Sequence, residues 1–140
     1  KRIGVAGGPD VDPALTAIDL STRPDGTIAE MFGVMRPYMA APPAVSPFDW
    51  GRRERLEALL GEAFDLTITT ETSHYVETGG EAAWNTFVTG YGPTRALAAS
   101  LDEDRRAALK RDFVAFHERY REGQGIHVPR TFVLTLGMRR

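Results

Sequence analysis

The sequence predicts an α/β fold in which a mixed, partly antiparallel sheet is flanked by helices. Strand-like segments occur near both ends and in the middle of the chain, and segments with apolar residues three and four positions apart lie between them. The first pattern is typical of half-buried strands and the second of amphipathic helices. Since 140 residues suffice for one hydrophobic core, we expect a single domain over residues 1–140.

Composition narrows the classes of partner. The formal net charge is −2, with no clustered basic face, and no apolar run approaches the roughly 20 residues of a membrane span. We therefore expect neither a nucleic-acid nor a membrane partner. The chain has no cysteine, which excludes disulfides and a thiolate nucleophile and favours a cytoplasmic location.

The first segment, residues 1–23, is short and rich in turn formers. Residues 2–6 have strand character and run into Gly7 and Gly8, and a second apolar run covers residues 14–20. Two strands joined by a loop are the simplest prediction.

Residues 24–68 predict two helices and a strand. Thr27 can cap a helix that ends or kinks at Pro37, and its apolar positions are Ile28, Met31, Phe32 and Met35. Asp49 can cap a second helix, which Gly61 closes. Apolar residues at 64, 66 and 68 alternate with polar ones, so a half-buried strand follows, with Val76 as its farthest end.

The C-terminal part predicts two further helices and a last strand. The Gly79–Gly80 turn opens a helix with one aromatic-rich stripe, made of Trp84, Phe87, Val88 and Tyr91. Ser100 and Glu103 form a capping box for a long helix with a charged outer face. Pro129 can start a strand that lies antiparallel beside residues 64–68.

Three segments together resemble class I S-adenosylmethionine (SAM)-dependent methyltransferases, namely residues 24–32, 46–51 and 82–93. The resemblance is to the C-terminal, acceptor-binding half of that family, over residues 24–140, so it implies an incomplete Rossmann-like fold whose cofactor half is shortened or missing. It implies methyl transfer from SAM to a small organic acceptor. The residues that it places at the acceptor are Met31, Phe32, Trp50, Trp84, Phe87 and Tyr91.

The cofactor residues can be aligned in two ways. Gly7 and Gly8 resemble the family's cofactor loop, and Asp19 resembles the acidic residue at the end of its ribose-binding strand. However, Asp19 follows Gly8 by only eleven positions, where about 20 are usual, and no helix fits between them. In the alternative alignment, residues 15–22 are the last parallel strand of the family's sheet.

Few residues are candidates for catalysis. SAM already carries an activated methyl group, so the protein mainly has to align acceptor and methyl and, for a hydroxyl acceptor, supply a base. His74 and His127 are the candidates for that base, whereas His117 is interpreted as a surface or interface group. The histidines lack metal-ligand spacing, and no Gly-x-Ser-x-Gly elbow of a serine hydrolase occurs.

Two other function classes stay open from sequence. The chain could be a non-catalytic ligand-binding or assembly module, or a cyclase or isomerase that reuses the methyltransferase pocket. Whichever of these functions applies, including methyl transfer, we expect a homodimer or a completing chain segment, because a sheet that lacks its neighbouring strands presents unpaired backbone groups at its edge.

Overall fold

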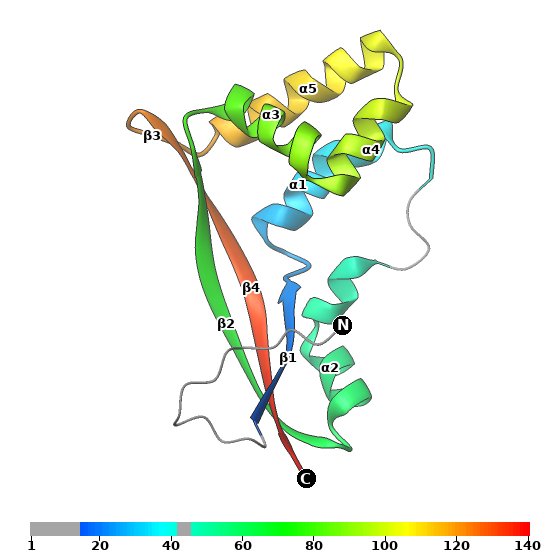
Figure 1. Ribbon diagram of the computed structural model, residues 1–140, viewed down its shortest axis with the longest axis vertical. Coiled ribbons are helices and arrows are strands. Elements are labelled where there is room, and N and C mark those ends of the chain that lie inside the picture. Colours follow the sequence, from blue (N-terminus) through cyan, green and yellow to red (C-terminus); the bar gives the residue numbers. More distant parts are fainter. Residues whose placement is uncertain (1–14, 42–45) are drawn as a thin grey trace. The chain divides into compact units, whose positions relative to one another are not determined.

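The computed structural model describes residues 15–41 and 46–140 (Figure 1). The predicted strand at residues 2–6 and the Gly7–Gly8 loop lie outside these residues. The chain divides into two compact units: unit 1 comprises residues 1–26, 45–73 and 131–140, and unit 2 comprises residues 27–44 and 74–130. Both strands and helices occur along the described chain, so the α/β class of the prediction is confirmed.

Unit 1 is built on a sheet whose strand order is β1-β4-β2. Strand β1 (Leu15–Thr22) runs antiparallel to β4 (Gly125–Arg139), with partners from Leu15–Met138 to Thr22–Phe132. The register shifts between Ala17 and Asp19. The C-terminal strand therefore lies between β1 and β2 (Phe64–Glu77), as predicted for the strand beside residues 64–68.

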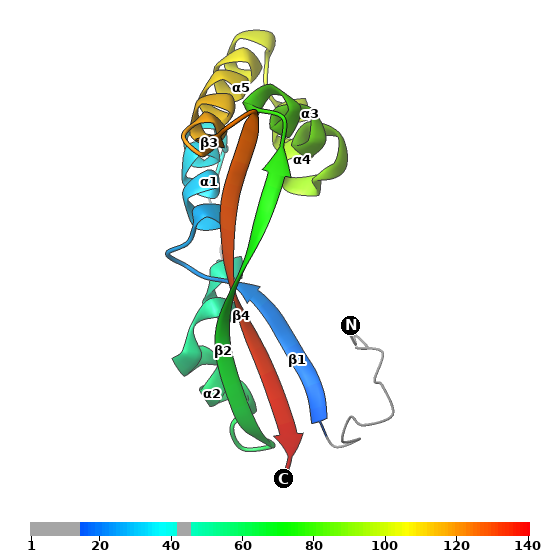
Figure 2. The same cartoon turned by 90° about the vertical axis from the view of Figure 1, so that its left-hand side faces the viewer.

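Strands β2 and β4 pass through both units (Figures 1 and 2). Their antiparallel course is fixed by contacts along the pair: the Arg140 N–H donates to the Ala63 carbonyl at 3.2 Å, and the Thr72 and Thr131 hydroxyls are 3.2 Å apart. The predicted start of β4 at Pro129 is wrong, because the strand begins at Gly125. Proline is tolerated there because β1 pairs with β4 only from Phe132 onward, leaving one side of the strand open.

A 3-10 helix, η2 (Pro47–Gly51), precedes helix α2 (Arg53–Leu60) in unit 1. The predicted cap at Asp49 is wrong. Arg52 occupies the N-cap position without a side-chain hydrogen bond, and Asp49 lies within η2, 3.5 Å from the Arg52 guanidinium. Gly61 follows the last residue of α2, as predicted, and Leu56 is the buried residue of this helix.

Unit 2 consists mainly of helices. These are α1 (Thr27–Met35), the 3-10 helix η1 (Arg36–Tyr38), α3 (Gly80–Gly90), α4 (Gly92–Ser100) and α5 (Glu103–Glu118), followed by the short strand β3 (Arg121–Glu122). Helix α1 starts at Thr27 and ends before Pro37, as predicted, and the Thr27 hydroxyl donates to the Pro129 carbonyl.

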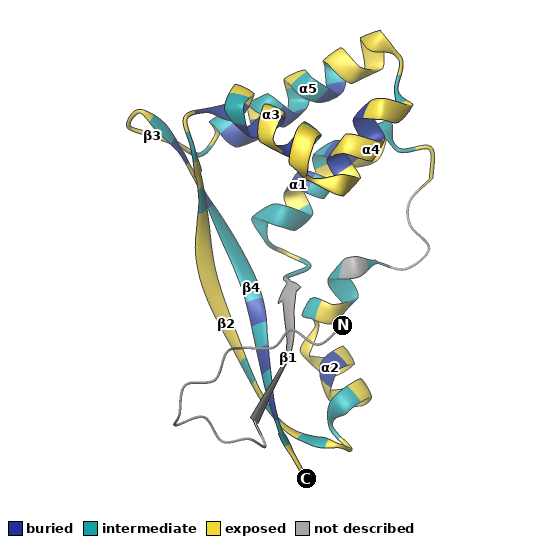
Figure 3. Ribbon diagram, viewed as in Figure 1, coloured by how far each residue is buried: buried dark blue, intermediate teal, exposed yellow. Residues whose placement is uncertain are grey.

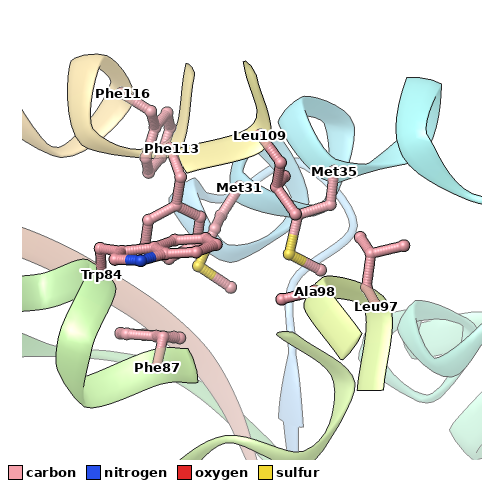
Figure 4. Packing of buried hydrophobic residues seen from close by; sticks show 9 residues of the cluster. All are labelled: Met31, Met35, Trp84, Phe87, Leu97, Ala98, Leu109, Phe113 and Phe116. Atoms are coloured by element: carbon pink, nitrogen blue, oxygen red, sulfur yellow. The ribbon is translucent and has the colours of Figure 1, made fainter. Parts of the chain in front are cut away.

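The core of unit 2 is formed by the inner faces of these helices (Figures 3 and 4). Its buried members are Met31, Met35, Trp84, Phe87, Leu97, Ala98, Leu109, Phe113 and Phe116. Truncating a large buried apolar side chain leaves a cavity and typically costs about 2–5 kcal/mol of stability. This cluster is therefore the main source of stability in unit 2.

The start of α3 packs closely on α5. A Cβ atom on Gly80 would lie 2.7 Å from the Val114 carbonyl oxygen, so only glycine fits without a shift of backbone. The Gly80 N–H donates to the Glu118 carboxylate at 2.7 Å, which satisfies one of the free donors at the helix N-terminus. The Gly79–Gly80 pair therefore forms the predicted turn and also allows α3 to pack closely on α5.

The predicted Ser100–Glu103 capping box is wrong. Asp102 caps α5 by accepting the Arg105 N–H at 2.8 Å, and the Ser100 hydroxyl donates to the Leu97 carbonyl at 2.7 Å. Both serine and aspartate are good N-cap residues, and the aspartate lies directly before the first helical residue.

Of the helices in the described part of the chain, none combines the length and hydropathy that crossing a bilayer requires.

Candidate functional site

Aromatic side chains from β2, α3 and α5 meet in unit 2. The Phe87 ring is central: its centroid lies 5.5 Å from Tyr75, 5.4 Å from Tyr91 and 5.3 Å from Phe113. These rings meet at steep angles of 60–90°, the edge-to-face arrangement that aromatic pairs prefer. We call Tyr75, Phe87, Tyr91, Phe113 and His117 the aromatic cluster.

Arg130 of β4 brings a positive charge to the aromatic cluster. Its guanidinium carbon lies 4.4 Å from the centroid of Tyr75 and 5.4 Å from that of Phe87, within the range of cation–π attraction. The side chain is half-buried. Burial lowers the pKa of Arg130 while the nearby Tyr75 and Tyr91 oppose this shift, and the guanidinium stays charged at neutral pH.

His117 is buried within the aromatic cluster, so its interpretation as a surface or interface group is wrong. Only 1% of the residue is exposed, and Nδ1 lies 2.9 Å from the Phe113 carbonyl oxygen one turn earlier in α5. Burial lowers the pKa of His117, and the positive charge of Arg130 lowers it further. The imidazole is therefore neutral at pH 7, with Nδ1–H as the donor to the carbonyl.

The two tyrosines of the aromatic cluster are neutral hydroxyl donors at physiological pH. Burial raises the pKa of Tyr75, and the nearby Glu77 carboxylate raises it further. Burial also raises the pKa of Tyr91, with Arg130 opposing. Tyr91 is the more accessible, with 37% of the residue exposed, so it is the outward-facing member of the cluster.

Five of the six predicted substrate-binding residues lie together in unit 2. Met31, Trp84 and Phe87 are buried in the core, and Phe32 packs against it. Tyr91 contacts Phe87 and Phe32, whose ring centroid is 6.5 Å from that of Tyr91. Tyr91 is the exposed member of these five, and Phe32 is half-buried. The sixth, Trp50, belongs to η2 of unit 1 and is 45% exposed.

The two histidines predicted as bases do not face the aromatic cluster. His74 on β2 and His127 on β4 are both exposed. His74 precedes Tyr75, which packs on the core, and His127 lies between the buried Ile126 and Val128. Because side chains alternate along a strand, both imidazoles point away from the core face.

The predicted cofactor residues are not gathered by the described structure. Gly7 and Gly8 lie outside the described residues. Asp19 lies inside β1, three residues before its end at Thr22, and pairs with Thr135 of β4. A ribose-binding acid is expected at a strand end. The continuous strand Leu15–Thr22 instead agrees with the extent of the strand in the alternative alignment, so the described residues do not form a SAM site that fits.

Outside the aromatic cluster, the described part of unit 2 carries one further feature of interest, a surface depression. Among the residues that the structure describes, no three His, Asp or Glu side chains are grouped as metal ligands. A shallow, open depression of about 580 Å³ in unit 2 has a floor of Trp84, Leu101 and Ala107 and a charged rim. The rim residues are Glu103, Arg106 and Lys110, and Lys110 is already ion-paired with Glu81 at 2.7 Å.

Neither a family model nor a curated protein matches this chain. A functional conclusion therefore depends on the residues themselves. Sequence analysis missed Arg130, Tyr75 and His117. A signal for Arg130 was present, because it shares the period-two face of Ile126 and Val128 and so places a charge on an otherwise apolar face.

Proposed function

We propose that this chain provides the acceptor-binding side of a SAM-dependent methyltransferase that acts on a small organic acceptor. The observation that carries the proposal is the gathering of Met31, Phe32, Trp84, Phe87 and Tyr91 from α1 and α3 into one unit. These residues come from two segments that resemble the family separately in sequence. The antiparallel C-terminal strand beside β2 agrees with the same resemblance.

The described residues support binding and orientation of an acceptor. Phe32 and Tyr91 offer exposed ring surface for an apolar or aromatic group, and the rigid core behind them holds these rings in place. SAM would supply the activated methyl group on its sulfonium. Since the described residues form no fitting SAM site, the cofactor would be held outside them.

The direct test is calorimetric titration of the chain with SAM and with its demethylated product. We expect both to bind. Asp19→Ala separates the two alignments: a loss of about 1–3 kcal/mol of binding, the range for a bond with a charged partner, would assign Asp19 to the ribose, and no change is expected if the cofactor is held elsewhere. Asp25→Ala is the matched control, since Asp25 is a surface acid paired with Arg23. Absence of any heat of binding would refute the cofactor part of the proposal.

A second candidate is a non-catalytic ligand-binding or assembly module. The observation in its favour is that both predicted bases, His74 and His127, point away from the aromatic cluster. This alternative predicts that aromatic ligands bind with or without SAM and that no methyl transfer from labelled SAM occurs to phenol, aniline or carboxylate acceptors.

We also propose that two copies of the chain associate. Among the described strands, β1 is paired on one side only, by β4, and such an edge invites a further strand. An interface of at least about 1,000 Å² in total is expected. Native mass spectrometry at micromolar concentration tests this, and a stable monomer would contradict it. A cytoplasmic location stays a prediction.

A further inference from the structure

His117 is a titratable side chain enclosed by aromatic rings. Only 1% of the residue is exposed. Four ring centroids lie within 6.3 Å of the imidazole centroid, those of Tyr75 on β2, Phe87 on α3, and Phe113 and Phe116 on α5. Ring carbons solvate a charge poorly, so these surroundings favour the neutral form of the imidazole.

The hydrogen bonding of the imidazole also fits the neutral form. Nδ1 lies 2.9 Å from the Phe113 carbonyl oxygen and donates its proton there. A second proton would add to Nε2 and turn the ring into a cation with a further donor. Aromatic faces attract a cation, but this attraction is smaller than the hydration that a fully buried charge loses. Protonation of the packed structure is therefore unfavourable.

A positive charge near His117 adds to this cost. The guanidinium carbon of Arg130 on β4 lies 4.4 Å from the Tyr75 centroid and 5.4 Å from the Phe87 centroid, so Arg130 and His117 lie against the same two rings. Burial lowers the pKa of His117 and the Arg130 charge lowers it further, against the opposing effects of the backbone hydrogen bond and of Glu118.

The other charged side chains near the imidazole have partners of their own. The Glu118 carboxylate accepts hydrogen bonds from the Arg121 side chain at 2.6 Å and from the Gly80 N–H at 2.7 Å. Arg119, at the end of α5, is ion-paired with Glu30 of α1 at 2.8 Å. Glu118 is thus committed to the junction of α3 and α5 and does not pair with the imidazole.

We propose that His117 is an acid-sensitive switch whose protonation loosens the packing of α3 on α5 and opens the aromatic cluster. In the open form water hydrates the imidazolium, and the two positive charges no longer share the same rings. This inference goes beyond methyl transfer and does not depend on it.

The pH range of the switch follows from linkage. The open form has the ordinary histidine pKa of 6.5, and the closed form has a lower one. Below pH 6.5 the open form therefore binds more protons, and acid favours it. One proton taken up on opening raises the opening constant by up to about tenfold per pH unit. Glu118, whose ordinary pKa is 4.5, affects stability mainly below that value, so the range from pH 6.5 to pH 4.5 reports on His117.

The test follows the full isotope-labelled chain by NMR over this pH range. Amide hydrogen exchange, corrected for intrinsic rates, gives the opening constant of α3 and α5, and the histidine ring signals give the protonation of each imidazole. We expect the opening constant to rise by at least about tenfold from pH 6.5 to pH 4.5, with His117 becoming protonated as it rises. An opening constant that stays the same, or opening while His117 is still neutral, would overturn the proposal.

Variants separate His117 from the other histidines. His117→Phe keeps an aromatic ring but cannot titrate, so the rise of the opening constant between pH 6.5 and pH 4.5 should disappear. His74→Gln is the matched control, because His74 is exposed on β2, and it should keep the full rise. A rise that survives in His117→Phe, or that is lost in His74→Gln, contradicts the assignment.

The proposal stays testable if His117→Phe does not fold. His117→Gln then gives the same comparison, since its amide does not titrate and retains an N–H donor. If neither variant folds, the coincidence of opening and His117 protonation in the natural chain decides.

Discussion

The buried positions of strands β2 and β4 change between even and odd numbers from one unit to the other. In unit 2 the buried residues of β4 are Ile126 and Val128, whereas in unit 1 they include Val133 and Thr135. Strand β2 changes in the same way, from partly buried even positions 64, 66 and 68 to partly buried odd positions 75 and 77. Because neighbouring side chains point to opposite faces, each strand carries two apolar patterns in different phase.

The two units also differ in what is buried. Unit 2 has a continuous cluster of nine buried apolar residues with four aromatic rings among them. In unit 1, among the residues whose burial is described, Leu56 and Val133 are the buried apolar side chains. Among these residues unit 2 has the larger buried core, and we infer that this core holds the aromatic cluster in place.

The strongest test of this difference is Phe113→Ala in unit 2. Phe113 is fully buried and its ring lies 5.6 Å from Trp84, 5.3 Å from Phe87 and 4.4 Å from His117. Loss of the ring should lower the free energy of unfolding by about 3–5 kcal/mol in urea titrations. Leu59→Ala is the control, since Leu59 is 45% exposed, and it should cost about 0.5 kcal/mol or less. Similar costs for the two variants would contradict the inference.

The corresponding change in unit 1 is Leu56→Ala. Leu56 has no exposed surface, so its truncation should cost about 2–5 kcal/mol if unit 1 unfolds together with unit 2. Hydrogen exchange shows whether it does. If the units unfold separately, amide protection in this variant falls in residues 53–73 and stays unchanged in α3 and α5. A uniform fall throughout the chain would show that the two units form one cooperative structure.

Sequence reasoning succeeded where one local signal decides an element. Helix α1 between Thr27 and Pro37, the end of α2 at Gly61 and the strand from Phe64 were all predicted from caps, proline or alternation. It failed where two signals compete. Asp102 and Ser100 can both cap a helix, and the position of α5 relative to its neighbours selects the former.

The candidate site was partly predictable, because the spacing of the aromatic residues on α3 is also a local signal. The stripe on α3 identifies Trp84, Phe87 and Tyr91 from spacing alone, but spacing does not reveal which of them stays exposed. That depends on how α1 and α5 cover the helix. His117 was misjudged because a histidine in a charged helix has an ordinary sequence context, and only packing shows that Phe113 and Phe87 surround it.

Tyr91→Ala tests whether the exposed end of the aromatic cluster is a binding surface. Because Tyr91 is 37% exposed and its ring contacts Phe87 and Phe32, we expect a loss of about 1–2 kcal/mol of stability. Affinity for aromatic ligands should fall at the same time. Tyr91→Phe, which keeps the ring, should preserve both. A loss of several kcal/mol with unchanged affinity would instead make Tyr91 a core residue.

The smallest effect is expected at Glu118, which joins the start of α3 to the end of α5. The pKa of Glu118 is lowered from 4.5 to about 2, mainly by hydrogen bonds from the Arg121 side chain and secondly by one from the Gly80 N–H. A lowered pKa stabilises the fold above pH 4.5, and this contribution is lost as pH falls toward 2. Glu118→Gln should therefore be less stable than the natural chain at pH 7, with a difference that narrows between about pH 5 and pH 2. Arg121→Met removes the larger cause, so the effect of Glu118→Gln should shrink in that background. The free energies of unfolding of the natural chain and of Glu118→Gln could instead differ by a constant amount over this pH range. That result would show that the carboxylate contributes by its shape rather than by its charge. The junction of α3 and α5 would then depend on packing at Gly80.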